Sequence, residues 1–339
     1  MKDKILNILI QADGYISGQR LCEMLGVSRT AIWKVINKLK EEGYVIKAIS
    51  NKGYCLMQVP DKIEEYVYKY EMKTKWIGKQ IICLDEVNST NTFAKKIGDK
   101  EDAHGCLIIT DNQIAGRGRR GRSWSIQKGE DIACSLVLKP QLEAKEASML
   151  TLIAAMAVQK GISYTLSECQ KDIESLDILN KNIQIKWPND IVYNKKKVCG
   201  ILTEMNADMD GISYVIIGIG INVNKIGIPE ELKHMATSIK IESGITIHRA
   251  KLVSYIMEQF EHLYDVFMET KDFSRLKKDY ESYLVNYANE VVVLHPKESF
   301  SGICRGISEK GDLIIEDEKG NIKEVFSGEV SVRGIYGYV

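Results

Sequence analysis

Between residues 80 and 268, six short runs rich in β-branched residues alternate with three helix-length segments, and few folds accommodate such an order. The strand-like runs are QIICLDEV, GCLIIT, IACSLVL, IQIKW, KVCGILTEM and SYVIIGIGINV. The helix-like segments are TNTFAKKIG, SMLTLIAAMAVQKGISYTL and HRAKLVSYIMEQFEHLYDVFM. This mixture predicts an α/β domain in which helices pack against a central sheet.

The first 60 residues show a different order, with three helix-length segments followed by a hairpin. Ser17 and Ser28 are suited to cap the second and third segments, and Gly26 to end the second. The stretches YVIKAI and YCLM are joined by SNKG, where Gly53 can adopt a positive φ. This order of elements resembles a winged helix-turn-helix domain.

The third helical segment, RTAIWKVINKLKEEG, has two opposite faces. Its apolar face comprises Ala31, Ile32, Val35, Ile36 and Leu39, and its polar face comprises Thr30, Trp33, Lys34, Asn37 and Lys38. Ammonium and hydrogen-bonding groups on one face suit a helix that lies in the major groove of DNA. Ser28, Arg29 and Lys52 complete the predicted DNA-binding set. A winged helix that binds protein is the alternative.

Charge and length set limits on the whole chain. Its 46 Lys and Arg balance its 46 Asp and Glu, but residues 1–60 hold nine basic and five acidic residues, so any affinity for nucleic acid is local. A length of 339 residues predicts two or three domains. The predicted boundaries are 1–60, 61–286 and 287–339. The sequence shows no membrane-spanning run and no signal peptide, so we expect a cytoplasmic protein with no membrane partner.

The eight cysteines are scattered singly, without a C-x-x-C pair, and the five histidines are equally dispersed. This spacing argues against a disulfide framework and against a zinc site. Most of the cysteines are predicted to be small buried apolar residues.

The densest cluster of charge is GRGRRGRSW, residues 116–124, which holds four arginines and three glycines. The sequence has no acidic residue between Asp111 and Glu130. Arginine forks bind phosphate and carboxylate, and glycines let backbone N–H groups converge on an anion. Two interpretations are open: an arm that binds nucleic acid, or a loop that closes over a small anionic ligand.

The stretch GIGIN, residues 218–222, does not meet the requirements of a dinucleotide fold, because Val223 stands where the fingerprint has glycine. The sequence also has no Walker A pattern. Gly218 and Gly220 are predicted instead to admit the close approach of a ligand or a neighbouring strand.

NSTN (88–91), GRGRRGRSW, KWPND (186–190) and GIGIN, in this order behind a winged helix, resemble the biotin protein ligases. The resemblance covers essentially the whole chain and is to the bifunctional kind, which also represses biotin genes. It implies an α/β (α+β) fold: an N-terminal winged helix, a central mixed-sheet catalytic domain and a C-terminal SH3-like β-barrel. The alternating short strands after Glu290 agree with the barrel.

The resemblance also implies a reaction, its cofactors and its partners. Biotin reacts with ATP, in the presence of Mg²⁺, to give biotinyl-5'-AMP, which then biotinylates a lysine of the biotin carboxyl carrier protein of acetyl-CoA carboxylase. The adenylate is also the implied corepressor, and the implied partners are operator DNA and, when liganded, a second copy of the chain.

Site residues are carried over by position. Lys186, Arg119 and Arg117 are the implied catalytic residues. The implied biotin and adenylate contacts are Ser89, Thr90, Asn91, Gln113, Arg117, Gly118, Arg119, Trp124, Lys186, Gly200, Gly218, Gly220, Asn222 and Arg333. Asp190 is expected to orient a donor or to help hold Mg²⁺. Arg120 and Arg122 are expected to be structural or to lie at a dimer interface.

Several alternatives stay open. Residues 89–91 could be only a helix cap, and Lys186 a surface lysine. The polar insertion 165–182 is predicted to be exposed. The rival functions are a biotin-sensing repressor without ligase activity, a lipoate-type ligase, and a minor-groove arm at residues 116–124.

Overall fold

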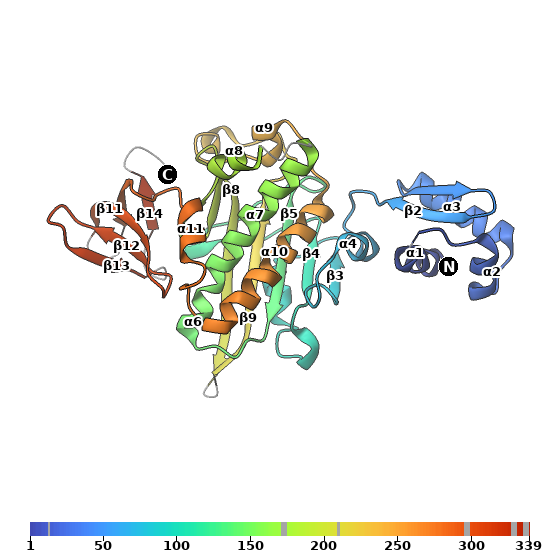
Figure 1. Cartoon of the computed structure of the whole chain (residues 1–339), viewed down its shortest axis with the longest axis horizontal. Helices are drawn as coiled ribbons and strands as arrows, with labels where there is room; N and C mark the ends of the chain where they lie inside the picture. Colours follow the sequence, from blue (N-terminus) through green and yellow to red (C-terminus); the bar gives the residue numbers. More distant parts are fainter. Residues whose placement is uncertain (13, 171–174, 209–210, 295–298, 327–330, 335–338) are drawn as a thin grey trace.

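A computed structural model describes the chain except residues 13, 171–174, 209–210, 295–298, 327–330 and 335–338. Figure 1 shows three parts in a row: the N-terminal helices and hairpin, a central sheet covered by two long helices, and a small C-terminal sheet. This architecture confirms the predicted fold class.

The N-terminal part has the predicted winged-helix order. Its elements are α1 (Lys2–Gln11), α2 (Gly18–Leu25), α3 (Arg29–Glu41), β1 (Val45–Ile49) and β2 (Gly53–Gln58). The Ser17 and Ser28 hydroxyls accept from the backbone N–H groups of Arg20 and Ala31, and so cap α2 and α3. Gly53 has φ 104°, and a side chain there would collide with the backbone of Ile16, which explains the glycine.

A short linker leads to α4 (Glu65–Glu71). The acidic and aromatic segment DKIEEYVYKYEMKTKWIGK predicts a linker helix over residues 61–79, and the observed helix is much shorter. The reason lies in α10 (Arg249–Thr270), whose Glu261 carboxylate accepts the backbone N–H groups of Lys75, Trp76 and Ile77. Those three amides are therefore fixed outside a helix. Val67 and Tyr68 are fully buried on α4, which packs against α10.

The central sheet has seven strands in the order β3-β4-β5-β9-β8-β7-β6. Among the strand pairs that the structure describes in this sheet, β3–β4 is parallel and the other five are antiparallel. The strands are β3 (Ile81–Leu84), β4 (Leu107–Thr110), β5 (Ile132–Leu138), β6 (Ile183–Lys186), β7 (Asp190–Tyr193), β8 (Lys196–Asp208) and β9 (Gly211–Ile221). Six were predicted, and β7 was missed.

Helices α7 (Leu150–Gln170) and α10 lie side by side across one face of this sheet (Figure 1). The stretch 144–170, which joins α6 (Ala144–Ser148) to α7, is long and apolar enough to cross a membrane, but 83% of its apolar window is buried inside the protein. Such burial is expected of a core helix. The opposite face of the sheet carries the short helix α5 (Thr90–Lys95), whose Ala94 packs on Ile108 and Ile216.

Successive residues of strand β9 point to opposite faces of the sheet. Ile217, Ile219 and Ile221 belong to the main core on the α7 side, while Gly218 and Gly220 point to the α5 side. The GIGIN stretch therefore closes the core on one face and leaves space on the other.

The prediction that residues 165–182 are an exposed insertion is wrong for part of the segment. Helix α7 continues to Gln170 and helix α8 covers Ser175–Asn182, while residues 171–174 lie outside the described part of the chain. Leu166 and Leu179 are buried, which extends the apolar stripe of α7. The Gln159 amide donates to Asn180 and to the carbonyl of Ile183, and so ties the end of the segment to the core.

The C-terminal part is a five-stranded antiparallel sheet, reached after α9 (Ile239–Ser243), α10 and α11 (Lys277–Tyr283). Its strands are β10 (Glu290–Leu294), β11 (Phe300–Ile307), β12 (Leu313–Glu316), β13 (Ile322–Val325) and β14 (Ser331–Gly334). The Trp187 indole donates to the Gly311 carbonyl at 3.1 Å. The C-terminal part thereby holds the turn that follows β6.

Candidate active site

A polar cradle lies at the N-terminus of α5. Ser89 stands at the N-cap position, but its side chain makes no capping bond; instead Gln113 Oε1 accepts from the backbone N–H of Thr90 at 3.0 Å. The Ser89, Thr90 and Asn91 side chains are buried. The alternative that residues 89–91 serve only as a cap therefore does not describe this site.

The orientation of Asn91 is fixed by its neighbours. Its Nδ2 donates to the Leu202 carbonyl at 3.2 Å and to Glu204 at 2.9 Å, so Oδ1 must face Ser135, whose hydroxyl lies 2.7 Å away. Burial raises the pKa of Glu204, but hydrogen bonds from Lys95 and Asn91 outweigh it and hold that pKa below its ordinary value. A charged Glu204 therefore keeps the Asn91 amide in one orientation.

The orientation of Asn91 also determines the directions of the hydrogen bonds made by Ser135 and Thr90. Ser135 has a single proton, and Asn91 Oδ1 can only accept it. The Thr90 proton then has two acceptors within the protein, the Ser135 hydroxyl at 2.7 Å and Gln113 Oε1 at 3.3 Å. The Thr90 oxygen keeps its lone pairs for a donor that enters the cavity beside it.

Residues 116–124 form a folded hairpin. The Trp124 N–H donates to the Gly116 carbonyl at 2.9 Å and the Gly118 N–H to the Arg122 carbonyl at 2.7 Å, with Arg120 at φ 58° in the turn. A side chain at Gly116 would collide with the Trp124 carbonyl and the Gln113 amide. This compact geometry favours the ligand-loop interpretation over an extended arm for DNA.

Arg119 connects this hairpin to the turn after β6. Its Nη1 donates to Asn189 Oδ1 at 3.0 Å, and Asn189 Nδ2 donates to the Ile201 carbonyl. Burial lowers the pKa of Arg119, which Asp190 partly offsets. An arginine remains charged despite such a shift, so the site holds a partly buried cation.

A cavity of about 600 Å³ lies beside the hairpin. Among the described residues, its lining includes six cationic side chains (Arg119, Arg120, Arg122, Lys186, Lys197 and Lys225) and a single acidic one, Asp190. Apolar side chains of segment 228–236 also line it, namely Ile228, Pro229, Leu232, Met235 and Ala236. Cationic and apolar side chains in one cavity suit a molecule that carries phosphates and a flat ring.

Lys186 is buried at the end of β6, with 5% of its surface exposed, and it lies opposite Asp190 in the β6–β7 register. The alternative of a surface lysine is therefore wrong. The peptide bond between Trp187 and Pro188 is cis.

Trp124 stands between this cavity and a smaller one of about 50 Å³ above the cradle. A side chain at Gly220 would collide with the Trp124 ring, and Lys197 Nζ lies 5.4 Å from a ring centroid of the same indole. Trp124 Nε1 is buried and has no hydrogen-bond partner among the described residues. A buried N–H of this kind favours a ligand that brings an acceptor or displaces the ring.

The structure places most of the predicted site residues in these two cavities. The smaller one is lined by Ser89, Thr90, Asn91, Gln113, Arg117, Gly118, Arg119, Trp124, Gly200, Gly218 and Gly220. Lys186, Asn222 and Asp190 line the larger one. Arg120 and Arg122 also line it, beyond their predicted structural role. Arg333 lies in β14, paired with Val292, and its side chain is outside the described residues.

The glycines predicted to leave room for a ligand ring make room here for protein side chains. Gly200 and Gly220 face the Trp124 indole, and Gly218 faces the Asn91 amide. At about 50 Å³ the smaller cavity has room for only a few water molecules. A bicyclic ligand therefore requires Trp124 to move.

Asp190 accepts a hydrogen bond from Lys197 at 2.6 Å. Among the described residues no group of three potential metal ligands comes together. Mg²⁺ is commonly held by one or two carboxylates together with substrate phosphates. Asp190 could supply one such carboxylate, but the described side chains do not form a metal site by themselves.

Most of the predicted DNA-binding residues are exposed on α3 or in the turn between β1 and β2. Ser28, Arg29, Thr30, Lys34, Lys38 and Lys52 are exposed, Trp33 is 56% exposed and Asn37 is half-buried. Ile32, Ile36 and Leu39 lie in the core, as the two-faced pattern predicts.

Sequence reasoning missed four residues of the site. Ser135 and Glu204 lie inside strands, Asn189 lies within KWPND, and Lys197 ends a run of three lysines that looks solvated. Asn189 could have been predicted from the sequence, because it lies between Lys186 and Asp190, which were both predicted to be site residues.

Comparison with known proteins agrees with this geometry. Residues 83–222 match the biotin/lipoate A/B protein ligase family, residues 2–55 an HTH domain, and residues 289–333 the biotin protein ligase C-terminal domain. The chain is 38% identical over 335 residues to the bifunctional ligase/repressor BirA of Bacillus spizizenii, covering 98% of each chain. It is 29% identical to BirA of Escherichia coli, covering 97% of this chain and 96% of that one.

A solved structure of similar fold is the biotin protein ligase from Aquifex aeolicus in complex with biotin and ATP. The similarity has a TM-score of 0.60 at 31% identity and covers 76% of this chain and 99% of that one.

Proposed function

This chain belongs to the family of bifunctional biotin protein ligases and repressors, and from that premise we propose how its residues perform both activities. It is an ATP-dependent biotin protein ligase that also binds DNA as a repressor. The observation that carries the proposal is the meeting of a polar cradle and a cation-lined cavity at Trp124. We expect this work to take place in the cytoplasm.

In the proposed complex the ureido ring of biotin enters the cradle once Trp124 moves. Its N–H groups meet the free lone pairs of Thr90, and Ser89 and Gln113 supply further polar contacts. Gly218 and Gly220 let the ring approach the sheet closely. The valerate tail then points past Gly118 into the larger cavity, toward Lys186.

ATP is proposed to bind in the larger cavity, with its base against the apolar side chains of segment 228–236 and its phosphates against the cationic side chains. A biotin carboxylate oxygen attacks the α-phosphorus, the bond to the β-phosphate breaks, and pyrophosphate leaves. Lys186, Arg119 and Arg117 offset the charge that gathers as two anions meet. Mg²⁺ is expected to accompany the ATP phosphates, with Asp190, which also accepts from Lys197, as the carboxylate that lines this cavity.

The second step transfers biotin to the carrier protein. The neutral amine of the acceptor lysine attacks the biotinyl carbonyl, AMP leaves, and the nitrogen loses a proton to form the amide. The nucleophile comes from the partner, so the chain needs no nucleophile of its own.

Biotin-dependent release of pyrophosphate from ATP, followed by transfer of labelled biotin to a carrier domain, tests this function. A repressor that only senses biotin would bind biotin without releasing pyrophosphate. A lipoate-type ligase would prefer lipoate when the two acids compete.

Lys34→Ala is expected to weaken operator binding and to leave ligation unchanged, because Lys34 is exposed on α3, away from both cavities. Loss of one phosphate contact should reduce the slope of log affinity against log salt by about one unit. Lys4→Ala on α1 removes the same charge from the same module and is the control. Equal slopes for both variants would contradict a DNA-facing α3.

We further propose that biotinyl-5'-AMP favours a homodimer that binds a palindromic operator. One winged helix offers few base contacts, whereas two linked copies multiply affinity. Operator titration and sedimentation are compared for apo protein, protein with biotin, and protein with biotin and ATP. The third state should show the strongest dimerisation and the tightest operator binding, by roughly 5- to 150-fold over the apo state. Identical behaviour in all three states would refute the switch.

A further inference from the structure

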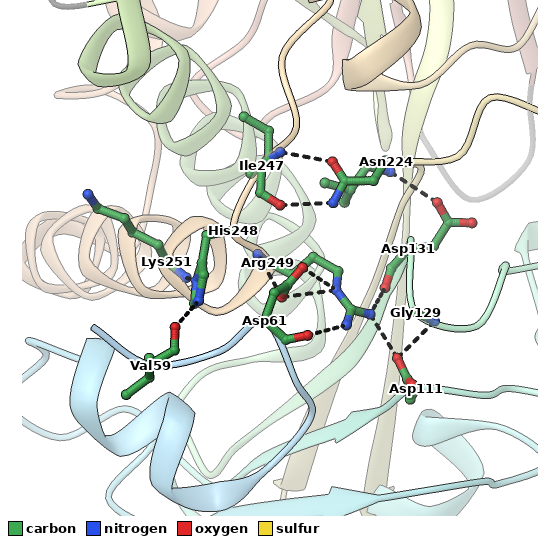
Figure 2. Close-up of polar contacts among 11 residues, drawn as sticks. Val59, Asp61, Asp111, Gly129, Asp131, Asn224, Ile247, His248, Arg249 and Lys251 are labelled. Atoms are coloured by element: carbon green, nitrogen blue, oxygen red, sulfur yellow. Dashed lines mark hydrogen bonds and ion pairs between the residues drawn. The ribbon is translucent and has the colours of Figure 1, made fainter. Parts of the chain in front are cut away.

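Arg249, at the first turn of α10, joins three segments that are distant in sequence (Figure 2). Its side chain is only 2% exposed. One side of the guanidinium faces Asp61, in the linker that follows the winged helix, and the other faces Asp111, which follows β4. The pattern of charge predicts no such residue, because HRAKL reads as an ordinary helix start.

On the loop side, Arg249 holds both ends of segment 111–131, which contains Gln113, the hairpin and Trp124. Its Nη1 donates to Asp111 Oδ1 at 2.8 Å and to the Asp131 carbonyl at 3.2 Å. Asp111 Oδ1 also accepts from the Gly129 N–H at 3.1 Å (Figure 2). We call segment 111–131 the ligand loop and its two ends the stems. The two stems are therefore joined through one nitrogen, Arg249 Nη1.

The far stem is tied in turn to the larger cavity. The Asp131 carboxylate accepts from the Val223 N–H at 3.0 Å and from Lys225 at 3.0 Å. Lys225 lines that cavity. Asp131 is fully buried, so this contact is a rigid part of the stem.

On the linker side, the Arg249 Nε lies 3.2 Å from both carboxylate oxygens of Asp61, and the backbone N–H of Arg249 also donates to Asp61 at 3.2 Å. One residue earlier, His248 Nε2 contacts the Val59 carbonyl at 3.1 Å (Figure 2). His248 Nδ1 accepts from the Lys251 N–H, so a neutral ring with its proton on Nε2 satisfies both contacts. The linker is thus docked on the start of α10.

We propose that Arg249 is a positioning residue that couples the ligand loop to the linker of the DNA-binding module. A buried guanidinium needs its acceptors on both sides, so movement of one side alters the contacts available to the other. Docking of the linker on Asp61 holds Arg249 where it fixes the loop stems, and the docked linker favours ligand binding. By reciprocity, a ligand that orders the loop favours the docked linker.

This inference rests on the proposed function in one respect, the binding of biotin by segment 111–131. The test uses the full-length protein and two readouts. Hydrogen exchange of segment 111–131 without ligand reports the mechanical coupling, and the KM for biotin with the matching kcat reports its effect on ligation.

Asp61→Ala is the informative variant, because Asp61 lies in the linker and lines neither cavity. We expect exchange in segment 111–131 and the KM for biotin each to rise about 5-fold or more, with kcat at saturating biotin retained. Glu65→Ala is the matched control, since Glu65 lies four residues away and forms an exposed ion pair with Lys69 within α4. It should leave both readouts at wild-type values.

Asp111→Ala tests the reverse direction and serves also if Asp61→Ala fails to fold. Loss of the loop-side acceptor should raise exchange in residues 59–64 of the linker, an effect that damage confined to the loop would not produce. Unchanged linker exchange in Asp111→Ala, or Asp61→Ala values equal to those of Glu65→Ala, would overturn the coupling.

The wild-type protein separates failure of this inference from failure of the proposed function. Saturating biotin should protect segment 111–131 from exchange. Absence of protection in the wild type would refute biotin binding by the loop. Protection in the wild type, together with wild-type exchange and KM in Asp61→Ala, would refute only the role of Arg249.

Discussion

Lys186→Ala is expected to reduce biotin-dependent pyrophosphate release by about 10²–10³-fold, because it removes a buried cation from the place where two anions react. The fold should survive, since the change shortens a side chain at the end of β6 and leaves the strand pairing intact. The measurement is single-turnover pyrophosphate release at saturating biotin and ATP, with circular dichroism to confirm folding.

Lys181→Ala is the control for this change. Lys181 is exposed in the last turn of α8, two residues before β6, and carries the same charge outside both cavities. It should retain wild-type release. A folded Lys186→Ala variant with near-normal release would remove Lys186 from the mechanism.

Arg119→Gly is expected to release the reactive adenylate about 10- to 150-fold faster, the range expected for loss of a hydrogen bond made by a charged group. Arg119 joins the hairpin to Asn189, so its removal frees the hairpin from the turn after β6. The freed adenylate should then acylate lysines of an unrelated bystander protein. Both the rate of adenylate loss and bystander labelling are measured.

Arg120→Gly is a close control, because it removes the same charge from the neighbouring position. Arg120 is exposed and has φ 58°, a conformation that glycine adopts readily. The hairpin should therefore remain closed and the adenylate retained. If both variants leak equally, net charge rather than the Arg119–Asn189 contact retains the intermediate.

The sequence allowed the longer elements to be predicted, because their patterns are unambiguous. The two faces of α3 and the β-branched run of β5 each identify their element. Strand β7 escaped prediction because its short apolar run, residues 191–193, lies between a Pro-Asn turn and a run of lysines. Segment 165–182 was judged by its polar composition, yet Leu166 and Leu179 are enough to bury parts of it.

The site residues with distinctive local motifs were predictable, and the residues that orient them were not. Arg119 belongs to a charge cluster that stands out in the sequence, whereas Glu204 acts through a contact with Asn91, 113 positions away. No local pattern reveals such a pair. Arg249 was missed for the same reason, since its partners Asp61 and Asp111 lie 188 and 138 positions from it.

Because isoleucine and glycine alternate along β9, mutations at neighbouring positions of this strand have different consequences. Substitution of Ile217 or Ile219 would lower the stability of the fold, while a side chain at Gly218 or Gly220 would displace the Asn91 amide or the Trp124 indole that lines the cradle. A change at one of these glycines would therefore act on ligand preference, whereas a change at a neighbouring isoleucine would act on folding. The same strand would keep the protein folded while its substrate preference changed.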